Sequence, residues 1–337
     1  MSQLHRSRRD ILKLLGSVPL VAAAGTSVVR AEQVAAPRQT RLCLVSRHLQ
    51  WTNVEEAVNV AAEAGCKAIA WTIRSGAHIL AENVERDLPK AVELAHKAGL
   101  ETPMCITAIV EAKSTRAEAI LSTMHGLGIR YYRAPSFRYD YNLELEPQLE
   151  ALKPRIGSLA DLNAKYSTTA MYHTHSGAGN VGGGVWDLWL MLRNFDRELV
   201  GLNYDLGHAT IRGGSGWVET SHFAHKYVHG LSVKDFRWVK GTGNRRVGAW
   251  TAEMVPGGEG MVDFSGMLSY FKSVGFAGPV ELYQEYSVTV PGVAAPVNML
   301  GTDFGKWKLE MSKAQYVALL KRDVDFYTRA LTDAGLV

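Results

Sequence analysis

The sequence predicts an α/β protein that folds as a single (β/α)8 barrel, a TIM barrel, over residues 41–337. From residue 41 onward, short apolar or β-branched runs alternate with segments of helical periodicity. Eight such units fit into about 250 residues, which is the usual length of this barrel. An open, doubly wound sheet is the alternative, but residues 46–50 lack the glycine-rich turn that follows the first strand of that fold.

The eight predicted strands are short runs in which apolar and β-branched residues dominate. In chain order they cover residues 41–46, 67–73, 101–106, 129–134, 168–173, 199–205, 228–233 and 279–285. Polar and titratable residues collect at the carboxyl ends of these runs. In a (β/α)8 barrel that edge carries the chemistry, so these residues are the candidates for an active site.

The predicted helices lie between the strands and carry apolar residues at helical spacing. They cover residues 54–64, 82–98, 116–127, 144–166, 186–194, 217–226 and 263–274, and a final helix over 313–332 is expected on the barrel exterior. Several end just before a glycine, namely Gly65, Gly99, Gly128 and Gly275. Glycine at that position accepts the left-handed backbone conformation that stops a helix.

Residues 1–31 have the pattern of a twin-arginine signal peptide. The segment Ser7-Arg8-Arg9-Asp10-Ile11-Leu12-Lys13 resembles the export motif and is followed by an apolar run over 14–29. Val29-Arg30-Ala31 is a cleavage site of the small-x-Ala type, which leaves residues 32–40 as a linker. The run is shorter than the roughly 20 residues of a spanning helix, so a retained anchor is disfavoured. We expect a periplasmic or secreted protein with no stable membrane span after cleavage.

The whole formal net charge of +4 comes from this leader. Residues 1–31 hold five basic residues and one acid, which leaves 32 basic and 32 acidic residues in the rest of the chain. A protein that binds nucleic acid is expected to carry a basic footprint. The neutral body shows none in bulk, so we expect no nucleic-acid partner.

The three cysteines form an odd set without a CxxC motif. Cys43, Cys66 and Cys105 each lie in or beside an apolar run that is predicted as a strand. We therefore expect small buried hydrophobic side chains rather than a disulfide or a nucleophile.

The strand over 168–173 ends in a His-x-His pair. Side chains alternate along a strand, so His173 and His175 should point the same way, into the barrel mouth. Such a pair often presents imidazoles to one metal ion. The alternative is that the two histidines only bind substrate through hydrogen bonds.

The strand over 199–205 ends with Asn203 and Asp205 on its inward face, and His208 follows three residues later on the expected loop. Asp205 and His208 are a plausible pair of metal ligands. The alternative for Asp205 is a cap on the next turn.

Three further strand ends supply charged groups. On the strand over 279–285, Glu285 is nearest the top of a face that it shares with Glu281 and Tyr283. A glutamate against an apolar barrel wall costs several kcal/mol unless it is paired or metal-bound, which favours a functional role. Lys234 follows the strand over 228–233, and either offsets charge on an enolate or forms a structural ion pair. Arg133 either binds a substrate oxygen or pairs at the surface.

These segments resemble the xylose-isomerase-like barrel superfamily of sugar isomerases, epimerases and inosose dehydratases. The matching segments, in chain order, are Tyr172-His173-Thr174-His175, Tyr204-Asp205-Leu206-Gly207-His208, Val233-Lys234-Asp235, Pro256-Gly257-Gly258-Glu259-Gly260 with Val262-Asp263-Phe264, and Gly275-Phe276-Ala277-Gly278-Pro279 with Glu285-Tyr286. The resemblance covers about residues 41–290.

The resemblance implies a divalent metal ion, often manganese, held by acids and histidines at the last four strand ends. It also implies proton transfer at a carbon next to a carbonyl or hydroxyl group. Ser232 stands where the family often has a ligand histidine, and His173 where many relatives have glutamate. The metal shell is therefore expected to be altered, or to be completed by His175 or His208.

The sequence thus predicts a metal-dependent sugar isomerase, epimerase or lyase (dehydratase) that acts on a free or keto sugar. An endonuclease of the same fold and a non-catalytic periplasmic sugar-binding protein are the alternatives, and an oligomer is compatible with the sequence. Manganese is the favoured metal, with magnesium, cobalt or zinc as alternatives. The assigned residues are Glu285, Lys234 and His175 for catalysis, Arg133, His208 and Asn203 for substrate binding, and His173, Asp205 and Glu285 for the metal.

Overall fold

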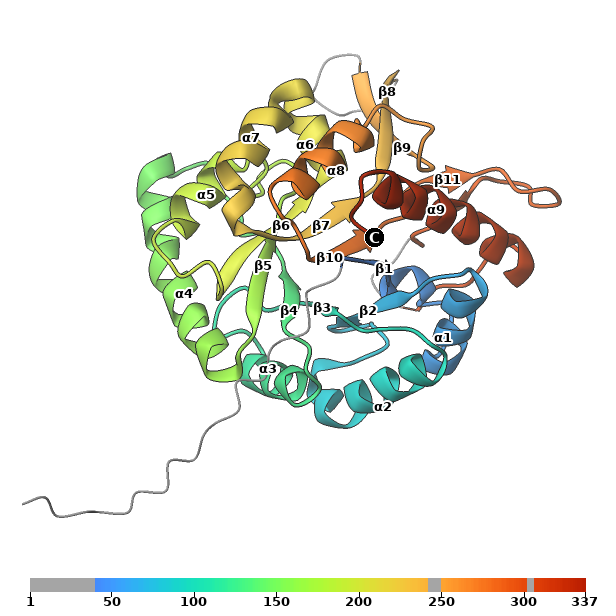
Figure 1. Cartoon of the computed structure of the whole chain (residues 1–337), viewed down its shortest axis with the longest axis horizontal. Helices are drawn as coiled ribbons and strands as arrows, with labels where there is room; N and C mark the ends of the chain where they lie inside the picture. Colours follow the sequence, from blue (N-terminus) through green and yellow to red (C-terminus); the bar gives the residue numbers. More distant parts are fainter. Residues whose placement is uncertain (1–39, 242–249, 302–305) are drawn as a thin grey trace, which may run out of the picture. The chain divides into compact units, whose positions relative to one another are not determined.

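The computed structural model describes residues 40–241, 250–301 and 306–337 and confirms the predicted barrel. Eight parallel strands close on themselves in the order β1-β10-β7-β6-β5-β4-β3-β2, with helices around the outside (Figure 1). The barrel strands are β1 (Arg41–Val45), β2 (Ala68–Ile73), β3 (Met104–Thr107), β4 (Tyr131–Ala134), β5 (Thr169–His173), β6 (Val200–Asp205), β7 (Val228–Val233) and β10 (Pro279–Leu282).

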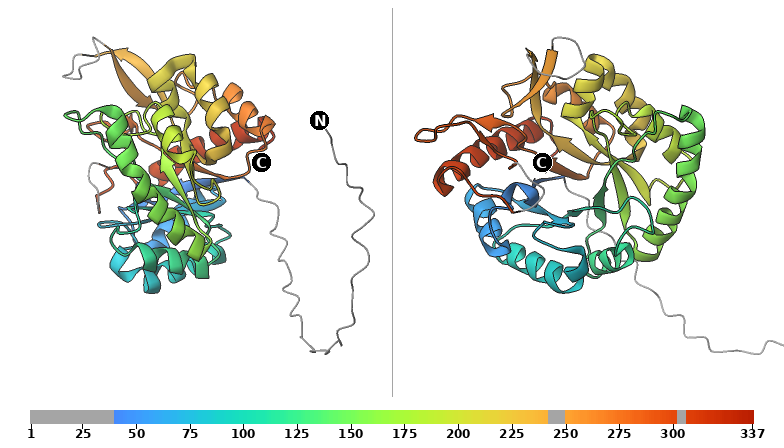
Figure 2. Two further views of the ribbon diagram at one scale, coloured as in Figure 1. Left: turned by 90° about the vertical axis from the view of Figure 1, so that its left-hand side faces the viewer. Right: turned by 180° about the vertical axis from the view of Figure 1, so that it is seen from behind.

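The helices cover the outer face of the barrel, as the view from behind in Figure 2 also shows. They are α1 (Val54–Glu63), α2 (Val84–Lys97), α3 (Ala117–Gly126), α4 (Leu145–Tyr166), α5 (Trp186–Leu192), α6 (Leu206–Gly213), α7 (Trp217–Ala224), α8 (Phe264–Ser273) and α9 (Lys313–Asp333). The predicted helix stops are confirmed. Gly65 after α1 and Gly275 after α8, for example, have φ angles of 84° and 79°.

Two hydrophobic cores hold the barrel together. The larger lies between the strands and the helices that cover them, and the smaller fills the barrel interior. The interior core contains small side chains from β1 and β2 packed against larger ones from β3, β4 and β5. All three cysteines are buried and free, which confirms their expected role as small hydrophobic side chains.

One segment that the sequence analysis did not anticipate is an antiparallel hairpin after β7. Its strands, β8 (Asp235–Lys240) and β9 (Trp250–Val255), pair from Asp235 with Val255 to Lys240 with Trp250. Only Lys234 separates β8 from the barrel strand β7, so the hairpin continues the barrel wall beyond its mouth. In Figure 1 it lies beside α6 and α7. A second, two-residue pair consists of β11 (Ser287–Val288) and β12 (Val297–Asn298).

Asp235 fastens the base of this hairpin to the loop that precedes α8. Its carboxylate accepts backbone N–H hydrogen bonds from Gly258 at 3.0 Å, Gly260 at 2.9 Å and Val262 at 3.2 Å. Two of the sequence segments that carried the family resemblance, the Lys-Asp pair and the Gly-rich loop, are therefore parts of one structural unit.

The predicted signal peptide lies outside the described residues, as does the linker except for Thr40. In the part of the chain that the structure describes, no helix has the length and apolar character needed to cross a membrane.

Candidate active site

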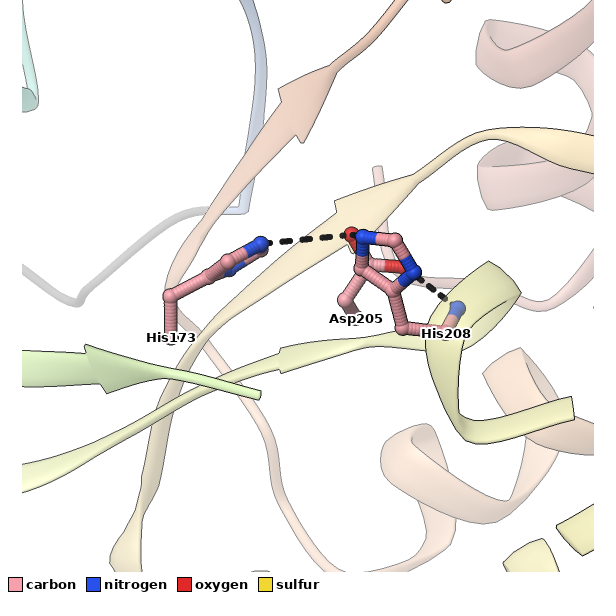
Figure 3. A group of neighbouring side chains, drawn as sticks. All are labelled: His173, Asp205 and His208. Carbon is pink, nitrogen blue, oxygen red and sulfur yellow. Dashed lines mark hydrogen bonds and ion pairs between the residues drawn. The ribbon is translucent and has the colours of Figure 1, made fainter. Parts of the chain in front are cut away.

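The centre of the candidate site is a group of three buried side chains at the barrel mouth (Figure 3). His173 ends β5, Asp205 ends β6, and His208 lies in the first turn of α6. One potential ligand atom from each of the three lies within 4.8 Å of the other two. The loop that was expected after β6 is instead a helix, and this helix turns His208 back over the mouth.

Asp205 has both of the roles that were weighed for it. Its Oδ1 accepts the backbone N–H of His208 at 2.8 Å and so caps α6. Its Oδ2 is buried without a hydrogen bond and faces Nε2 of His173 at 3.7 Å and Nε2 of His208 at 3.9 Å. The capping bond fixes the carboxylate, and the second oxygen faces the cationic side of the site, where the Lys234 ammonium lies 3.2 Å away.

Both histidines place an unprotonated Nε2 atom near Oδ2 of Asp205. Nδ1 of His173 donates to the amide oxygen of Asn203 at 2.7 Å, so the Nε2 atom of the neutral ring is an acceptor. Nε2 of His208 accepts from the Lys234 ammonium at 2.9 Å, so its Nδ1–H points to the Ser176 hydroxyl at 2.8 Å. Burial first, and then the nearby cations, hold the pKa of each imidazole well below its usual range, which keeps the rings neutral.

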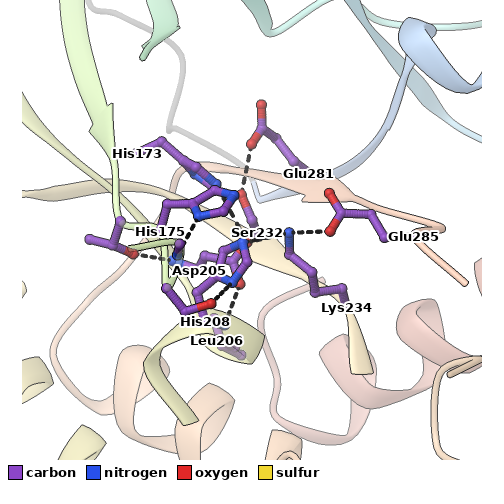
Figure 4. A network of polar contacts seen from close by, with 12 residues as sticks. His173, His175, Asp205, Leu206, His208, Ser232, Lys234, Glu281 and Glu285 are labelled. Carbon is purple, nitrogen blue, oxygen red and sulfur yellow. Dashed lines mark hydrogen bonds and ion pairs between the residues drawn. The ribbon is translucent and has the colours of Figure 1, made fainter. Parts of the chain in front are cut away.

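Lys234 is the cation of this site (Figure 4). Its Nζ lies 3.2 Å from Oδ2 of Asp205 and 3.0 Å from Oε2 of Glu285. Burial opposes the charge, but the Asp205 and Glu285 carboxylates outweigh it and raise the pKa of the ammonium. In the same way burial would raise the pKa of Glu285, but Lys234 outweighs it and lowers that pKa. Burial raises the pKa of Asp205 to about 6, with Lys234 opposing the shift.

His175 is held in one tautomer by the loop that follows it. The backbone N–H of Gly177 donates to its Nδ1 at 2.8 Å. Burial, followed by the charge of Lys234, lowers the pKa of the imidazole to about 4, so the ring is neutral near pH 7. A neutral ring whose Nδ1 accepts must carry its proton on Nε2. His175 is therefore a hydrogen-bond donor through Nε2.

A second polar layer lies on the strand β10 side. Glu281 is fully buried, and its Oε2 lies 2.7 Å from the Ser232 hydroxyl, which is also 2.6 Å from the Asn203 amide oxygen. Its Oε1 lies 3.4 Å from Nε of Arg133. Burial raises the pKa of Glu281, with Arg133 and then Ser232 opposing the shift. Ser232, at the position where the family often has a ligand histidine, thus links Glu281 to the amide that orients His173.

Tyr283 separates two cations across the mouth. The Arg133 guanidinium lies 5.5 Å and the Lys234 ammonium 4.8 Å from its ring centroid. Arg74 also belongs to this side. Burial, and then the charges of Arg133 and Arg47, lower its pKa to about 10.

The structure brings most of the assigned residues together, with some in unexpected places. His173 and Asp205 meet as the proposed ligands, and His208, which was assigned to substrate, joins them. Glu285 lies on the far side of Lys234, where it pairs with the ammonium. Asn203 is fully buried behind His173, and its amide oxygen is already used by that ring.

The sequence analysis did not assign a role to Glu281, Tyr283 or Ser176. The two-residue alternation that placed Glu281 and Tyr283 on the face of Glu285 was a sufficient signal for the first two. Ser176 carries no such signal, because its contact with His208 depends on a helix that was expected to be a loop.

The donor set fits a divalent cation. Two imidazole lone pairs and one buried carboxylate oxygen without a hydrogen bond converge on one point, and a partner orients each imidazole through its other nitrogen. The two imidazole ligands favour a transition metal such as zinc over magnesium, and the carboxylate is also a suitable ligand for manganese. Two of these three ligand atoms, Oδ2 of Asp205 and Nε2 of His208, now face the ammonium of Lys234.

Comparisons with known proteins agree with this architecture. The solved structures that resemble the chain include an IOLI protein with a bound zinc atom, at 14% identity and a TM-score of 0.61, covering 87% of this chain and 98% of that one. The probable 3-DHS dehydratase AsbF from Bacillus anthracis matches at 14% identity and a TM-score of 0.59, with 86% and 98% covered. The D-psicose 3-epimerase from Clostridium cellulolyticum H10, solved with D-tagatose, matches at 12% and 0.58, with 86% and 99% covered.

At these identities the solved structures establish the fold. Comparison with curated protein sequences finds no match. The family model described as xylose isomerase-like TIM barrel matches residues 58–295. This segment runs from α1 to beyond β10 and contains every residue of the site described above. The chain therefore belongs to the xylose isomerase-like TIM barrel family.

Proposed function

We propose that the protein moves a proton at a carbon next to the carbonyl group of a free or keto sugar, as an isomerase, epimerase or dehydratase that uses a divalent metal ion. One observation carries the proposal: the buried Lys234 ammonium lies between the Glu285 carboxylate and the His173–Asp205–His208 group. The solved epimerase and the probable dehydratase of the same fold support this reaction class.

His173, Asp205 and His208 would hold the metal. When bound, it supplies a Lewis acid that polarises a carbonyl or hydroxyl oxygen of the sugar. The two imidazoles are neutral and the carboxylate is fixed by its capping bond, so the ligand atoms are preorganised. Zinc, cobalt and manganese are the metals that this donor set favours.

Glu285 is the proposed general base. Lys234 lowers its pKa, so the carboxylate is ionised at neutral pH, and with 21% of its side chain exposed it is the most open carboxylate of the network. The α C–H bond of the sugar breaks, its proton passes to Glu285, and the electron pair moves into the carbonyl to give an enediolate. Lys234, 3.0 Å away, offsets the negative charge of that enediolate.

His175 is the proposed proton donor. Among the described contacts, the hydrogen bonds of His175 involve only its Nδ1 atom. Its Nε2–H is therefore available to donate to a substrate. Returning the proton to the neighbouring carbon gives an isomer, and returning it to the opposite face gives an epimer. Donation to a departing β-hydroxyl group releases water and gives the dehydrated product. In each case the proton that Glu285 accepted then passes through solvent to His175, which returns both side chains to their starting protonation states.

The sugar is proposed to be unphosphorylated because the leader pattern predicts export. Phosphorylated sugars are mostly cytoplasmic, so an exported enzyme meets free sugars, glycosides and their keto derivatives.

Incubation of the metal-loaded protein with free and 3-keto sugars in D2O tests the proposal. Deuterium should appear at the carbon next to the carbonyl, and Glu285→Gln should lower its rate at least 100-fold. Glu253→Gln is the matched control, because Glu253 is half-exposed on the hairpin and pairs with Arg237. Sugar binding without deuterium exchange would overturn the proposal and favour a sugar-binding protein.

A further inference from the structure

Beside the candidate site lies a cavity of about 660 Å³ that the proposed proton transfer does not use. Of the site residues it shares only His175, Ser176 and His208, so it begins at the barrel mouth and extends away from Lys234 and Glu285. One wall is the loop after β5 together with α6, and the other wall is the β8–β9 hairpin. The lining residues are His175, Ser176, Gly177, Ala178, His208, Ile211, Arg212, Trp238, Trp250, Thr251, Ala252 and Met254.

The hairpin turns its apolar face toward this cavity. Strand pairing places Trp238 opposite Ala252 and Lys240 opposite Trp250, so the two indoles are diagonal neighbours on one face. Met254 continues the same face toward the barrel. The opposite face carries the Arg237–Glu253 ion pair at 2.6 Å. Alternation along both strands therefore puts Trp238, Trp250 and Met254 on the inner face, with Lys240 at its far end, and the Arg237–Glu253 pair on the outer face.

Trp250 is 54% exposed, although an indole is a large apolar side chain. Trp238 beside it is half-buried. An exposed indole next to a half-buried one at the rim of a concave polar site is typical of a surface that binds a flat ring. The facing wall supplies groups that bind hydroxyl or ring oxygens, among them Arg212 and the Ser176 hydroxyl. Among the described lining residues there is no Asp or Glu, which argues against a cationic ligand.

We propose that this cavity is a subsite for a second ring, so that the substrate is a glycoside rather than a single sugar. The inference rests on the proposed function, which places the reacting sugar over Lys234 and Glu285. The ring attached to that sugar then lies past the His175 and His208 rings, whose centroids are 4.0 Å apart, and stacks on Trp238 and Trp250. The stacking chemistry is shared by two sources, the apolar face of a second sugar and an aromatic aglycone.

Direct binding measurements separate these cases. Isothermal titration of the metal-loaded protein uses three probes: glucose, the disaccharide cellobiose and 4-nitrophenyl β-D-glucoside. At least one two-ring probe should bind at least tenfold more tightly than glucose, which corresponds to about 1.4 kcal/mol. Tighter binding of cellobiose identifies a second sugar as the natural occupant, and tighter binding of the aryl glucoside identifies an aromatic aglycone.

Two substitutions test the tryptophan wall. Trp238→Ala and Trp250→Ala should each weaken the preferred two-ring probe about tenfold and leave glucose unchanged, and Trp250→Phe should restore most of the affinity. Trp186→Ala is the control, since Trp186 is 43% exposed on α5 and does not line the cavity. Unchanged melting temperatures establish that the variants fold.

Equal affinities for one-ring and two-ring probes, no binding of either two-ring probe, or tryptophan variants that bind like the wild type would each overturn the inference. Binding requires no turnover. A two-ring preference without deuterium exchange would therefore overturn the proposed function and keep the subsite. Deuterium exchange on simple sugars, together with tryptophan variants that bind the two-ring probes like the wild type, would support the proposed function and overturn the subsite.

Discussion

The Lys234 ammonium lies 3.2 Å from Oδ2 of Asp205, the same oxygen that a metal ion would need. Nζ also lies 2.9 Å from Nε2 of His208, a second proposed ligand atom. A divalent cation and the ammonium therefore compete for the same two lone pairs. Lysine serves here as the resident counter-charge of a buried carboxylate, which would be costly to leave unpaired.

Lys234→Met should raise metal affinity and abolish turnover. Without the ammonium, the affinity for zinc or manganese should rise at least tenfold. The metal ion then no longer has to displace Lys234 from Asp205 and His208. The metal-free variant should be about 3 kcal/mol less stable, since the buried Asp205 carboxylate then lacks its counter-charge and keeps only the capping bond. Titration calorimetry and thermal unfolding with and without metal measure both effects.

Lys234→Arg is the matched variant, because it keeps the charge and should keep metal affinity within a few-fold of the wild type. If Lys234→Met bound metal no better than the wild type, competition between lysine and metal would be refuted.

Gly260→Ala should unfold the base of the hairpin. A Cβ at this position would lie 2.1 Å from Oδ1 of Asp235 and 2.4 Å from the carbonyl oxygen of Phe236, so a backbone segment has to move. Such overpacking typically costs 1–3 kcal/mol, and the loss of the Asp235 hydrogen bonds adds to it. Urea unfolding should therefore show a drop of at least about 2 kcal/mol. Gly126→Ala in α3, where nothing lies within 4 Å of the added Cβ, should leave stability unchanged or slightly higher.

The barrel was predictable because its signals are local. Each strand was an apolar run, each helix had its own period, and the glycines after α1 and α8 marked where helices stop. The strand ends then placed His173 and Asp205 at one edge of the sheet without any knowledge of the three-dimensional structure. For the same reason, alternation along β10 put Glu281 and Tyr283 on the inward side.

The missed features depend on contacts between distant segments. The hairpin forms from β8, directly after a barrel strand, and from β9 across a turn, and neither strand is an uninterrupted apolar run. His208 reaches the site because Asp205 caps a helix there. Glu285 pairs with Lys234 rather than with His173 because the chain after Leu282 is no longer part of the strand, which strand periodicity alone does not reveal.

His78, a histidine away from the site, should make the protein less stable as pH falls. Burial lowers the pKa of His78 to about 4, below its ordinary value of 6.5. A group whose pKa is lower in the folded state contributes stability that is present above pH 6.5 and is lost as pH falls toward 4. Each unit of such a difference is worth about 1.4 kcal/mol at most. The melting temperature of the wild type should therefore fall between pH 6.5 and pH 4.

His78→Phe isolates the contribution of His78 to the pH dependence of stability. Asp205, whose pKa is raised, changes stability with pH in the opposite direction, but it does so equally in the wild type and in the variant and therefore cancels in their difference. The stability difference between wild type and variant should shrink or reverse as pH falls through this window. A difference that stays constant from pH 8 to pH 4 would contradict the assignment.

Export should depend on the two leader arginines. Changing Arg8 and Arg9 together to lysine keeps the charge of the leader but removes the paired motif. The precursor should then remain in the cytoplasm, which fractionation and immunoblotting detect. An unchanged periplasmic yield would refute the twin-arginine interpretation, and a yield that falls only when the apolar run is also altered would indicate a general secretory signal.

The ligand set can be decided by comparing His208→Gln with Glu285→Gln. His208 lies in the group with His173 and Asp205, so its substitution, like Asp205→Asn, should lower metal occupancy at least tenfold. Glu285 pairs with Lys234, so Glu285→Gln should keep the metal and lose deuterium exchange. His173→Ala should lose the metal, whereas His173→Glu should retain part of it, because it restores the carboxylate that many relatives have there. Elemental analysis of folded protein measures occupancy in each case.

His175→Ala is the control within the same loop, because the Nδ1 atom of His175 is used by Gly177 and the ring lies outside the ligand group. It should keep full metal occupancy and lose turnover. If Glu285→Gln lost the metal while His208→Gln kept it, then Glu285 would be the third ligand, as the strand pattern alone suggested. Lys234 would in that case have to leave both carboxylates when the ion binds, because its ammonium now contacts Asp205 and Glu285 together.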